Sequence, residues 1–222
     1  MKKLVIDLGH GGSDPGAVGQ NKTHEADIVL AIGKELNELL KGYDIEIKFT
    51  RLSDKYISLY ERARIANVFN ADYFLSIHIN SAKDKSVRGV EVWQYSDGNE
   101  NINKFSKGLC NDVSKIFNIR NRGLKFSKEL SVLKNTKMPS ALIEVDFISN
   151  TMAEKDLIVS ENIKSIALAI KNNLMKLFGL EANVSETLYR VCIGAYRDKN
   201  NAINQVKLAK KKDFKDAYII NF

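Results

Sequence analysis

Short apolar runs alternate with longer amphipathic stretches along most of the chain. The runs are continuous and bounded by polar or glycine-rich segments, which is typical of strands buried on both faces, and they cover residues 4–8, 45–50, 73–79, 90–95 and 141–147. Apolar positions with helical spacing lie between them, over residues 25–40, 57–69, 101–117 and 151–178. We expect Thr23 to cap the first helix and the last helix to contain a break. The alternation predicts an α/β fold, a mostly parallel twisted sheet with helices on both faces.

The end of the chain has a separate pattern. Residues 179–187 are polar and open with a glycine, which predicts a helix end followed by a linker. Residues 188–196 and 217–220 then alternate as strands do, and residues 200–212 form a lysine-rich helical pattern between them. We expect a small C-terminal βαβ unit; the alternative is a solvated tail without function.

Composition limits the class of protein. The chain has 222 residues, 44% of them hydrophobic, so it can bury a sizeable core without a disulfide framework or a structural metal. It contains no apolar run of about 18 residues, so we expect no membrane span. The N-terminus begins Met1-Lys2-Lys3, but the apolar stretch after it ends at Asp7, which is too short for a signal peptide. We therefore expect a protein made in the cytoplasm and released without the general secretion route, or a trimmed form.

The charge and the cysteines exclude further classes. The net charge of +7 suggests nucleic acid at first, but the lysines are spread along helices without interleaved aromatic residues, and no nucleic-acid-binding motif occurs. We expect no nucleic-acid partner and attribute most of the charge to surface solvation. Cys110 and Cys192 lie far apart and neither belongs to a CxxC motif, so we expect both to be reduced thiols that pack as small hydrophobic residues.

Candidate chemistry gathers where predicted elements begin or end. His10 follows the first strand between glycines that allow a sharp turn, His78 lies at the end of the third strand, and Glu25 opens the first helix. In a sheet of this kind, functional sites collect beyond the carboxyl ends of the strands. Two histidines and one glutamate are the ligands of an open catalytic zinc site, with water in the fourth position. Spacing alone supports a structural interpretation equally well. In that interpretation His10 is a loop residue and His78 is a strand residue with ordinary hydrogen-bond partners.

A series of short motifs runs in order through residues 1–178. They are Gly9-His10-Gly11-Gly12 with Asp14-Pro15-Gly16-Ala17; Glu25; Thr50-Arg51; Leu59-Tyr60-Glu61-Arg62 and Ala66-Asn67; Ala71-Asp72 and Ser76-Ile77-His78-Ile79-Asn80; Gly89-Val90-Glu91-Val92; Arg122-Gly123-Leu124; and Met138-Pro139 with Glu144-Val145-Asp146-Phe147-Ile148-Ser149-Asn150. Together they resemble the zinc-dependent N-acetylmuramoyl-L-alanine amidases of the amidase-3 type, which cut peptidoglycan between the lactyl group of muramic acid and the first alanine of the stem peptide. The resemblance implies a phosphorylase/hydrolase-like α/β catalytic domain over residues 1–178, in an enzyme of the endolysin or autolysin kind.

The resemblance also implies roles for individual residues. Zinc would be held by His10, Glu25 and His78, and Glu144 would be the catalytic carboxylate. Amide hydrolysis needs such a group, because a carboxylate outside the metal shell must take a proton from water and return it to the leaving amine. The family usually has glycine where this chain has Asp146, two residues from Glu144 and on the same side of the strand. We expect this extra carboxylate to change the pKa of Glu144 or the shape of the pocket.

Four other residues lie close to these motifs. Glu91 is a second candidate for the catalytic carboxylate, although a structural role is the better supported interpretation. His24 is expected to be exposed or to support a ligand from outside the metal shell. Asn80 and Ser149 lie beside the metal and catalytic motifs, where they would bind amide groups of the substrate or cap turns.

The C-terminal unit resembles the first half of a SPOR domain, a peptidoglycan-binding module, through Tyr189, Val191, Ile193-Gly194-Ala195-Tyr196 and Ala217-Tyr218-Ile219. We expect residues 188–222 to bind glycan strands. Two strands and one helix make a small core with an open edge, so we also expect this unit to pair with a second copy and form a homodimer. The positive charge of the chain would favour anionic wall polymers such as teichoic acids.

Three functions fit these residues: a zinc amidase of peptidoglycan, a binding protein that has lost activity on the same fold, and a metallopeptidase that cuts a peptide bond within the stem. The complete ligand set together with Glu144 favours the amidase. Phage lysis, spore-related lysis and cell separation are all compatible with it. The short apolar stretch at the N-terminus favours an endolysin that reaches the wall through a permeabilised membrane.

Overall fold

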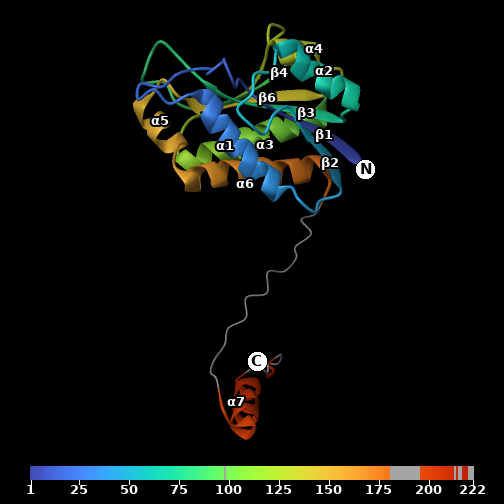
Figure 1. Ribbon diagram of the computed structural model, residues 1–222, viewed down its shortest axis with the longest axis vertical. Helices are drawn as coiled ribbons and strands as arrows, with labels where there is room; N and C mark the ends of the chain where they lie inside the picture. Colours follow the sequence, from blue (N-terminus) through green and yellow to red (C-terminus); the bar gives the residue numbers. More distant parts are fainter. Residues whose placement is uncertain (98, 181–195, 213, 215–216, 220–222) are drawn as a thin grey trace. The chain divides into compact units, whose positions relative to one another are not determined.

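The computed structural model describes residues 1–97, 99–180, 196–212, 214 and 217–219. The chain divides into two compact units, Met1–Asn183 and Val184–Phe222. The first unit contains one sheet with helices on both faces (Figure 1).

The sheet has six strands in the order β2-β1-β3-β6-β4-β5. Four of them, β2, β1, β3 and β6, run parallel, whereas β4 is antiparallel to β6 and parallel to β5. The predicted mostly parallel sheet is therefore confirmed. The strands are β1 (Lys2–Leu8), β2 (Ile45–Phe49), β3 (Tyr73–Asn80), β4 (Val90–Gln94), β5 (Asn121–Phe126) and β6 (Ser140–Phe147).

Two hydrophobic clusters of unequal size lie on the two faces of the sheet. The larger one packs beneath α1, α3 and α6, and the smaller one beneath α2 and α4 (Figure 1). Side chains alternate between the faces, so that in β1 Leu4 and Ile6 join the larger cluster and Val5 joins the smaller. The helices are α1 (Glu25–Leu39), α2 (Leu59–Phe69), α3 (Glu100–Phe117), α4 (Ser131–Asn135), α5 (Thr151–Leu157) and α6 (Ser160–Phe178).

The face beneath α2 and α4 changes character along the strands. Near the strand starts it is apolar, through Val5, Phe74 and Leu142. Further along, positions of the same parity are polar: Asp7 in β1, Ser76 and His78 in β3, and Glu144 in β6. The larger cluster continues on the opposite face at these levels, so the change concerns one face only. This face is where a site can form.

The structure differs from the sequence prediction in three places. The strand Asn121–Phe126 and the helix Ser131–Asn135 were not expected, because each is short and half-exposed and carries few apolar residues. The N-cap position of the first helix is held by His24, whose side chain makes no capping hydrogen bond, and not by Thr23. The expected break within residues 151–178 is confirmed, since α5 ends at Leu157 and α6 begins at Ser160.

The described part of the second unit contains α7 (Lys199–Lys211), capped by Asp198, whose side chain accepts hydrogen bonds from two backbone amides. This helix agrees with the predicted lysine-rich helix. The predicted strand at 188–196 falls outside the described residues except for Tyr196, and so does Cys192. In the second predicted strand, the structure describes residues 217–219, and these belong to neither a strand nor a helix.

Two further expectations can be compared with the structure. Cys110 is fully buried in α3, and burial raises the pKa of its thiol to about 12, so it packs as a small apolar residue, as predicted. Across the described helices, none combines the length and the apolar character that crossing a bilayer requires.

Candidate active site

Three side chains from separate elements meet at one end of the sheet. His10 follows β1, Glu25 is the first residue of α1, and His78 lies in β3. Glu25 Oε1 is 3.2 Å from His10 Nε2 and 2.9 Å from His78 Nδ1, and one donor atom of each residue lies within 4.8 Å of the others. The structure thus brings together the three residues that the sequence suggested as metal ligands.

Glycines make room for these rings. A Cβ atom on Gly9 would lie 2.3 Å from the ring of His78, and one on Gly16 would lie 2.6 Å from the ring of His10. Both distances are far inside van der Waals contact, so any larger residue would displace a histidine. His10 itself has φ +58°, a left-handed conformation that costs a non-glycine residue roughly 1–2 kcal/mol. The surrounding contacts must hold it there.

Glu25 is almost fully buried, yet both of its oxygens have partners. Oε2 accepts a hydrogen bond from the backbone amide of Ala17 at 2.9 Å, and Oε1 accepts one from that of Ile79 at 2.9 Å. Burial by itself would raise the pKa of this carboxyl, but hydrogen bonds and charge interactions with His10 and His78 hold it well below its usual range. Glu25 is therefore an anion placed between two imidazoles.

His10 is oriented from behind by a second carboxylate. Its Nδ1 lies 2.8 Å from Asp14 Oδ2, which leaves Nε2 directed at Glu25. Burial lowers the pKa of His10, but Glu25 and Asp14 more than offset this and raise it overall. A carboxylate on the outer nitrogen is the usual partner of a histidine that binds a metal through its other nitrogen.

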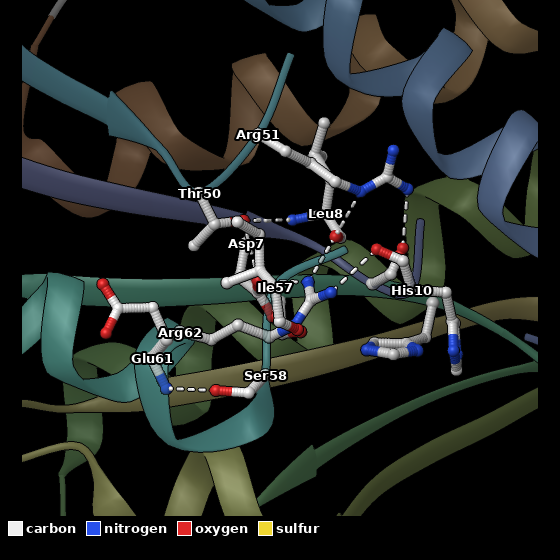
Figure 2. A network of polar contacts seen from close by, with 12 residues as sticks. Asp7, Leu8, His10, Thr50, Arg51, Ile57, Ser58, Glu61 and Arg62 are labelled. Atoms are coloured by element: carbon white, nitrogen blue, oxygen red, sulfur yellow. Dashed lines mark hydrogen bonds and ion pairs between the residues drawn. The ribbon is translucent and has the colours of Figure 1, made fainter. Parts of the chain in front are cut away.

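Arg62 holds the strand end that leads to His10. Figure 2 shows its guanidinium, which comes from α2, between β1 and the following turn. It donates to Asp7 Oδ1 at 2.8 Å, to the carbonyl of Leu8 at 2.5 Å and to the carbonyl of His10 at 2.7 Å. Asp7 is itself fully buried and also accepts from two hydroxyl groups, those of Thr50 and Ser76.

Arg51 connects the two segments that carry His10 and Glu25. Its Nη2 donates to the carbonyl of Gly9 at 2.7 Å and to that of Ala26 at 2.9 Å. Gly9 precedes His10 and Ala26 follows Glu25, so one guanidinium fixes the spacing of both segments. Arg51 and Arg62 are buried, and each positive charge is surrounded by oxygen acceptors.

Glu144 completes the polar row on this face. It lies opposite His78 in the β3–β6 pairing and opposite Glu91 in the β4–β6 pairing. Its Oε2 is buried and has no hydrogen-bond partner among the described residues. Burial, together with the negative charges of Glu25 and Glu91, raises the pKa of Glu144 well above its usual value. A buried carboxylate oxygen without a partner indicates a functional group more than a structural one.

Asp146 does not have the expected relation to Glu144. Its carboxylate accepts from Arg88 at 2.8 Å and 3.0 Å and from the backbone amide of Gly89 at 2.9 Å. Burial, Glu25 and Glu91 account for the raised pKa of Glu144, and Asp146 has no part in it. The expectation that Asp146 tunes this pKa was wrong, because Arg88 neutralises its charge and the carboxylate anchors the turn before β4.

The remaining candidates have structural partners. Glu91 is buried and accepts from Arg122 and Lys125 at 2.7 Å and 2.5 Å, so the structural interpretation of this residue is the better one. Asn80 donates to Glu91 Oε1 at 2.9 Å, and its Oδ1 accepts from the backbone amide that follows it. Ser149 is buried and its hydroxyl accepts from the amide of Ala82.

The surroundings of His24 differ from those of His10 and His78. Its side chain is about half exposed, and its nearest carboxylate, that of Asp27, is 3.7 Å away. It therefore follows the prediction of an exposed position.

Sequence reasoning gave no role to Asp14, Arg51, Arg62 or Glu154. Glu154 on α5 accepts three hydrogen bonds from Asn21 and one from the amide of Thr23, and so fixes the loop that leads into α1. The signal was present in part, because these residues lie within or next to the motifs. Their partners are mostly backbone groups, however, and a sequence does not reveal which backbone groups meet in space.

Two histidines and a carboxylate meet at one end of this mostly parallel sheet, next to a second carboxylate that has an unpartnered oxygen. This arrangement is typical of hydrolases with a catalytic metal site. Comparison with known proteins gives the family. The model of the N-acetylmuramoyl-L-alanine amidase family (Amidase_3) matches residues 4–176. The chain therefore belongs to the N-acetylmuramoyl-L-alanine amidases, enzymes that hydrolyse the bond between N-acetylmuramic acid and L-alanine in peptidoglycan.

Two curated relatives are similar over nearly the whole chain. The sporulation-specific N-acetylmuramoyl-L-alanine amidase of Bacillus subtilis (strain 168) is 36% identical over 217 residues, covering 96% of this chain and 83% of that protein. The N-acetylmuramoyl-L-alanine amidase CwlM of Bacillus licheniformis is also 36% identical, over 222 residues, covering 99% of this chain and 85% of that protein. In both, the similarity extends beyond the sheet into the C-terminal unit.

A solved structure gives a complementary match. The CwlD amidase from Clostridioides difficile, determined in complex with the GerS lipoprotein, superimposes with a TM-score of 0.75 at 30% identity, covering 81% of this chain and 99% of that one. That share of this chain is close to the length of the Met1–Asn183 unit. The amidase fold therefore accounts for the first unit alone.

Proposed function

We propose that the chain is a zinc-dependent amidase, with zinc held by His10, Glu25 and His78 and with Glu144 as the catalytic carboxylate. One observation carries the proposal: three donors of the right kind converge beside a buried carboxylate oxygen that has no described partner. Ligand atoms about 2.0–2.1 Å from a tetrahedral zinc ion lie roughly 3.3 Å from one another. The separations of 2.9 Å and 3.2 Å between Glu25 and the histidines fit that arrangement.

The chemistry divides between the metal and the protein. When bound, zinc supplies a Lewis acid that makes water more acidic and the amide carbonyl more electrophilic. Glu144 takes the proton of the attacking water on its free oxygen and delivers it to the nitrogen of the leaving alanine. The raised pKa of this carboxyl suits both halves of the task, since a group that accepts and then gives a proton works best near the working pH.

The surrounding side chains keep this arrangement rigid. Asp14 and Glu25 orient His10, and Arg51 and Arg62 hold the backbone on either side of it. The reacting groups therefore need little reorganisation when substrate binds.

Digestion of purified cell walls, with mass spectrometry of the products, tests the proposal. An amidase releases peptides with a free N-terminal alanine and leaves intact muramic acid residues. A metallopeptidase that cuts within the stem would instead leave alanine on the muramic acid, and a protein that only binds would release nothing. Either of the last two results would overturn the assignment.

We also propose that residues 188–222 form a wall-binding unit, half a SPOR-like module, that pairs with a second copy. The similarity of two amidases over this segment supports a role beyond that of a tail. The described helix α7 is rich in lysine, which would favour anionic wall polymers.

Sedimentation of the full chain beside a version that ends at Gly179 tests the pairing. We expect a dimer for the full chain and a monomer for the shortened one. We also expect the shortened chain to bind walls less than the full chain, with a larger difference at low salt, where charge attraction is less screened. Two monomers would refute the pairing, and unchanged wall binding would refute the targeting role. Release through a permeabilised membrane stays a prediction, and it requires co-expression with a membrane-permeabilising protein to test.

A further inference from the structure

Two cations share one buried carboxylate next to Glu144. Arg122 Nε lies 2.7 Å and Lys125 Nζ 2.5 Å from the same oxygen of Glu91. Within the described ranges, neither cation has another carboxylate at ion-pair distance. One negative charge therefore faces two positive ones, and the cluster carries a net positive charge.

The cationic heads are fixed in place and remain accessible. The guanidinium of Arg122 lies 5.0 Å from the ring centre of Phe147, and the ammonium of Lys125 lies 5.1 Å from that of Trp93. Their side chains are 27% and 30% exposed, whereas Glu91 beneath them is 4% exposed. A solvated anion can thus reach the two cations although it cannot reach Glu91.

The cluster lies on the same face of the sheet as the candidate active site. Residues directly opposite each other on neighbouring strands point to the same face, and His78, Glu144 and Glu91 are opposite one another across β3, β6 and β4. Lys125 is opposite Trp93, which has the same parity as Glu91. Polar groups therefore form one row from the histidines to the two cations.

The spacing of this row suits a peptide. Glu91 is one strand, about 4.8 Å, from Glu144, and the two cations lie one hydrogen bond beyond Glu91. An extended chain advances about 3.3–3.6 Å per residue. A substrate whose scissile amide lies at Glu144 would place the next one or two residues after alanine near Arg122 and Lys125.

We propose that Arg122 and Lys125 form a subsite for a carboxylate of the stem peptide, just beyond the alanine whose bond is cut. The subsite rests on the proposed function, because it takes the cleavage point to be at Glu144. It makes the enzyme selective for stems that carry an acidic group there over stems in which that group is amidated. Glu91 is a positioning residue that holds both cations toward the peptide.

A pair of synthetic substrates tests this selectivity. The first is N-acetylmuramoyl-L-alanyl-D-glutamate, and the second is its diamide, in which both carboxylates are primary amides. We expect the wild-type kcat/KM to be roughly tenfold or more higher for the acid, as a charge-assisted hydrogen bond would provide. Added salt should narrow the difference, because the cations are partly solvated.

Variants assign the effect to the two cations. Arg122→Gln and Lys125→Gln should each lower the ratio of kcat/KM for the acid to kcat/KM for the diamide by roughly tenfold. Lys104→Gln is the matched control, since it removes the same charge from an exposed pair on α3. Equal rates for the acid and the diamide in the wild type, or variants that slow both substrates equally, would overturn the subsite.

Binding separates this inference from the proposed function. If the wild type cleaves neither compound at the alanine bond, the proposed function is wrong. Calorimetry on Glu144→Gln then still tests the subsite, because it measures affinity without turnover. Tighter binding of the acid than of the diamide, abolished by the added Arg122→Gln change, supports the subsite, and equal binding overturns it.

Discussion

The two sides of the active site differ in how completely their polar atoms are paired. On the side of the three proposed metal ligands, called the metal side below, both oxygens of Glu25 accept hydrogen bonds from backbone amides. His10 is paired with Asp14, and two buried arginines donate to the neighbouring carbonyls. On the other side, Oε2 of Glu144 is buried with no partner in the described structure. The proposed metal ligands are thus well supplied with hydrogen bonds, whereas the proposed proton carrier has a buried oxygen without a described partner.

This contrast has an energetic side. A buried polar atom without a partner costs about 1–3 kcal/mol, whereas a paired one contributes modestly to stability. The metal side therefore adds rigidity, whereas the unpartnered oxygen of Glu144 lowers stability, a cost that its proposed catalytic role would explain. Substitutions on the two sides should separate these effects.

The largest effect is expected on the metal side. His78→Ala removes one of three donors, so the purified protein should lose both its zinc and its activity. Metal analysis and wall digestion measure the two losses. His24→Ala is the control, since the side chain of this exposed histidine faces Asp27, and it should keep both properties. Full zinc occupancy in His78→Ala would refute the ligand assignment.

Glu144→Gln should separate metal binding from catalysis. The amide keeps the shape of the side chain but cannot accept the proton, so we expect zinc to stay bound and turnover to fall by ~10²-fold or more. The melting temperature should stay the same or rise by about 2–4 °C, since a buried ionisable group is removed.

Asp146→Asn is the matched control for this substitution. It changes a carboxylate two residues away whose charge Arg88 takes up, and it should leave turnover near that of the wild type. Near-normal turnover in Glu144→Gln would mean that another group moves the proton.

Arg51→Lys and Arg62→Lys test the frame behind the metal side. Lysine keeps the charge but cannot bridge several carbonyls, so the zinc dissociation constant should rise about 10–100-fold. Activity should recover at saturating zinc. Arg64→Lys on the exposed face of α2 is the control. A lower melting temperature with unchanged zinc affinity would show that the two arginines stabilise the fold only.

Glu91→Gln gives the smallest effect, and one that depends on pH. Burial by itself would raise the pKa of Glu91, but the hydrogen bonds from Lys125 and Arg122 outweigh burial, so the pKa is lowered overall. In the folded protein this carboxyl therefore stays deprotonated below the unfolded pKa of about 4.3. Its stabilisation is complete above that pH and is lost as the pH falls through the lower folded pKa. The difference in melting temperature between wild type and variant should therefore be largest near neutral pH and shrink below about pH 4. A constant difference would contradict the charge pairing.

Much of the fold follows from local pattern. Continuous apolar runs predicted five of the six strands, and helical spacing predicted the longer helices, because each of these elements is fixed by its own burial. The strand Asn121–Phe126 is different. It lies at the edge of the sheet, none of its residues is fully buried, and Gly123 interrupts it, so its position depends on pairing with β4.

The candidate site was likewise predictable only in part. His10, Glu25, His78 and Glu144 were found because their chemical types and their motifs limit what they can do. The expected effect of Asp146 on the pKa of Glu144 was wrong because its carboxylate pairs with Arg88, which is 58 residues away in the sequence, whereas its effect on the pocket stays a prediction. Partners of this kind are set by the tertiary fold, and only the structure reveals them.

The position of β6 has a consequence for how the enzyme is made. Among the described strands it comes last along the chain, yet it lies between β3 and β4 in the sheet and carries Glu144. A nascent chain that has not yet reached residue 140 lacks the strand that joins the two parts of the sheet, and it lacks the proposed proton carrier as well. We therefore expect incomplete translation products and N-terminal proteolytic fragments that lack β6 to be inert. A cell that makes this wall-cutting enzyme is exposed to its activity only once the catalytic unit is almost complete.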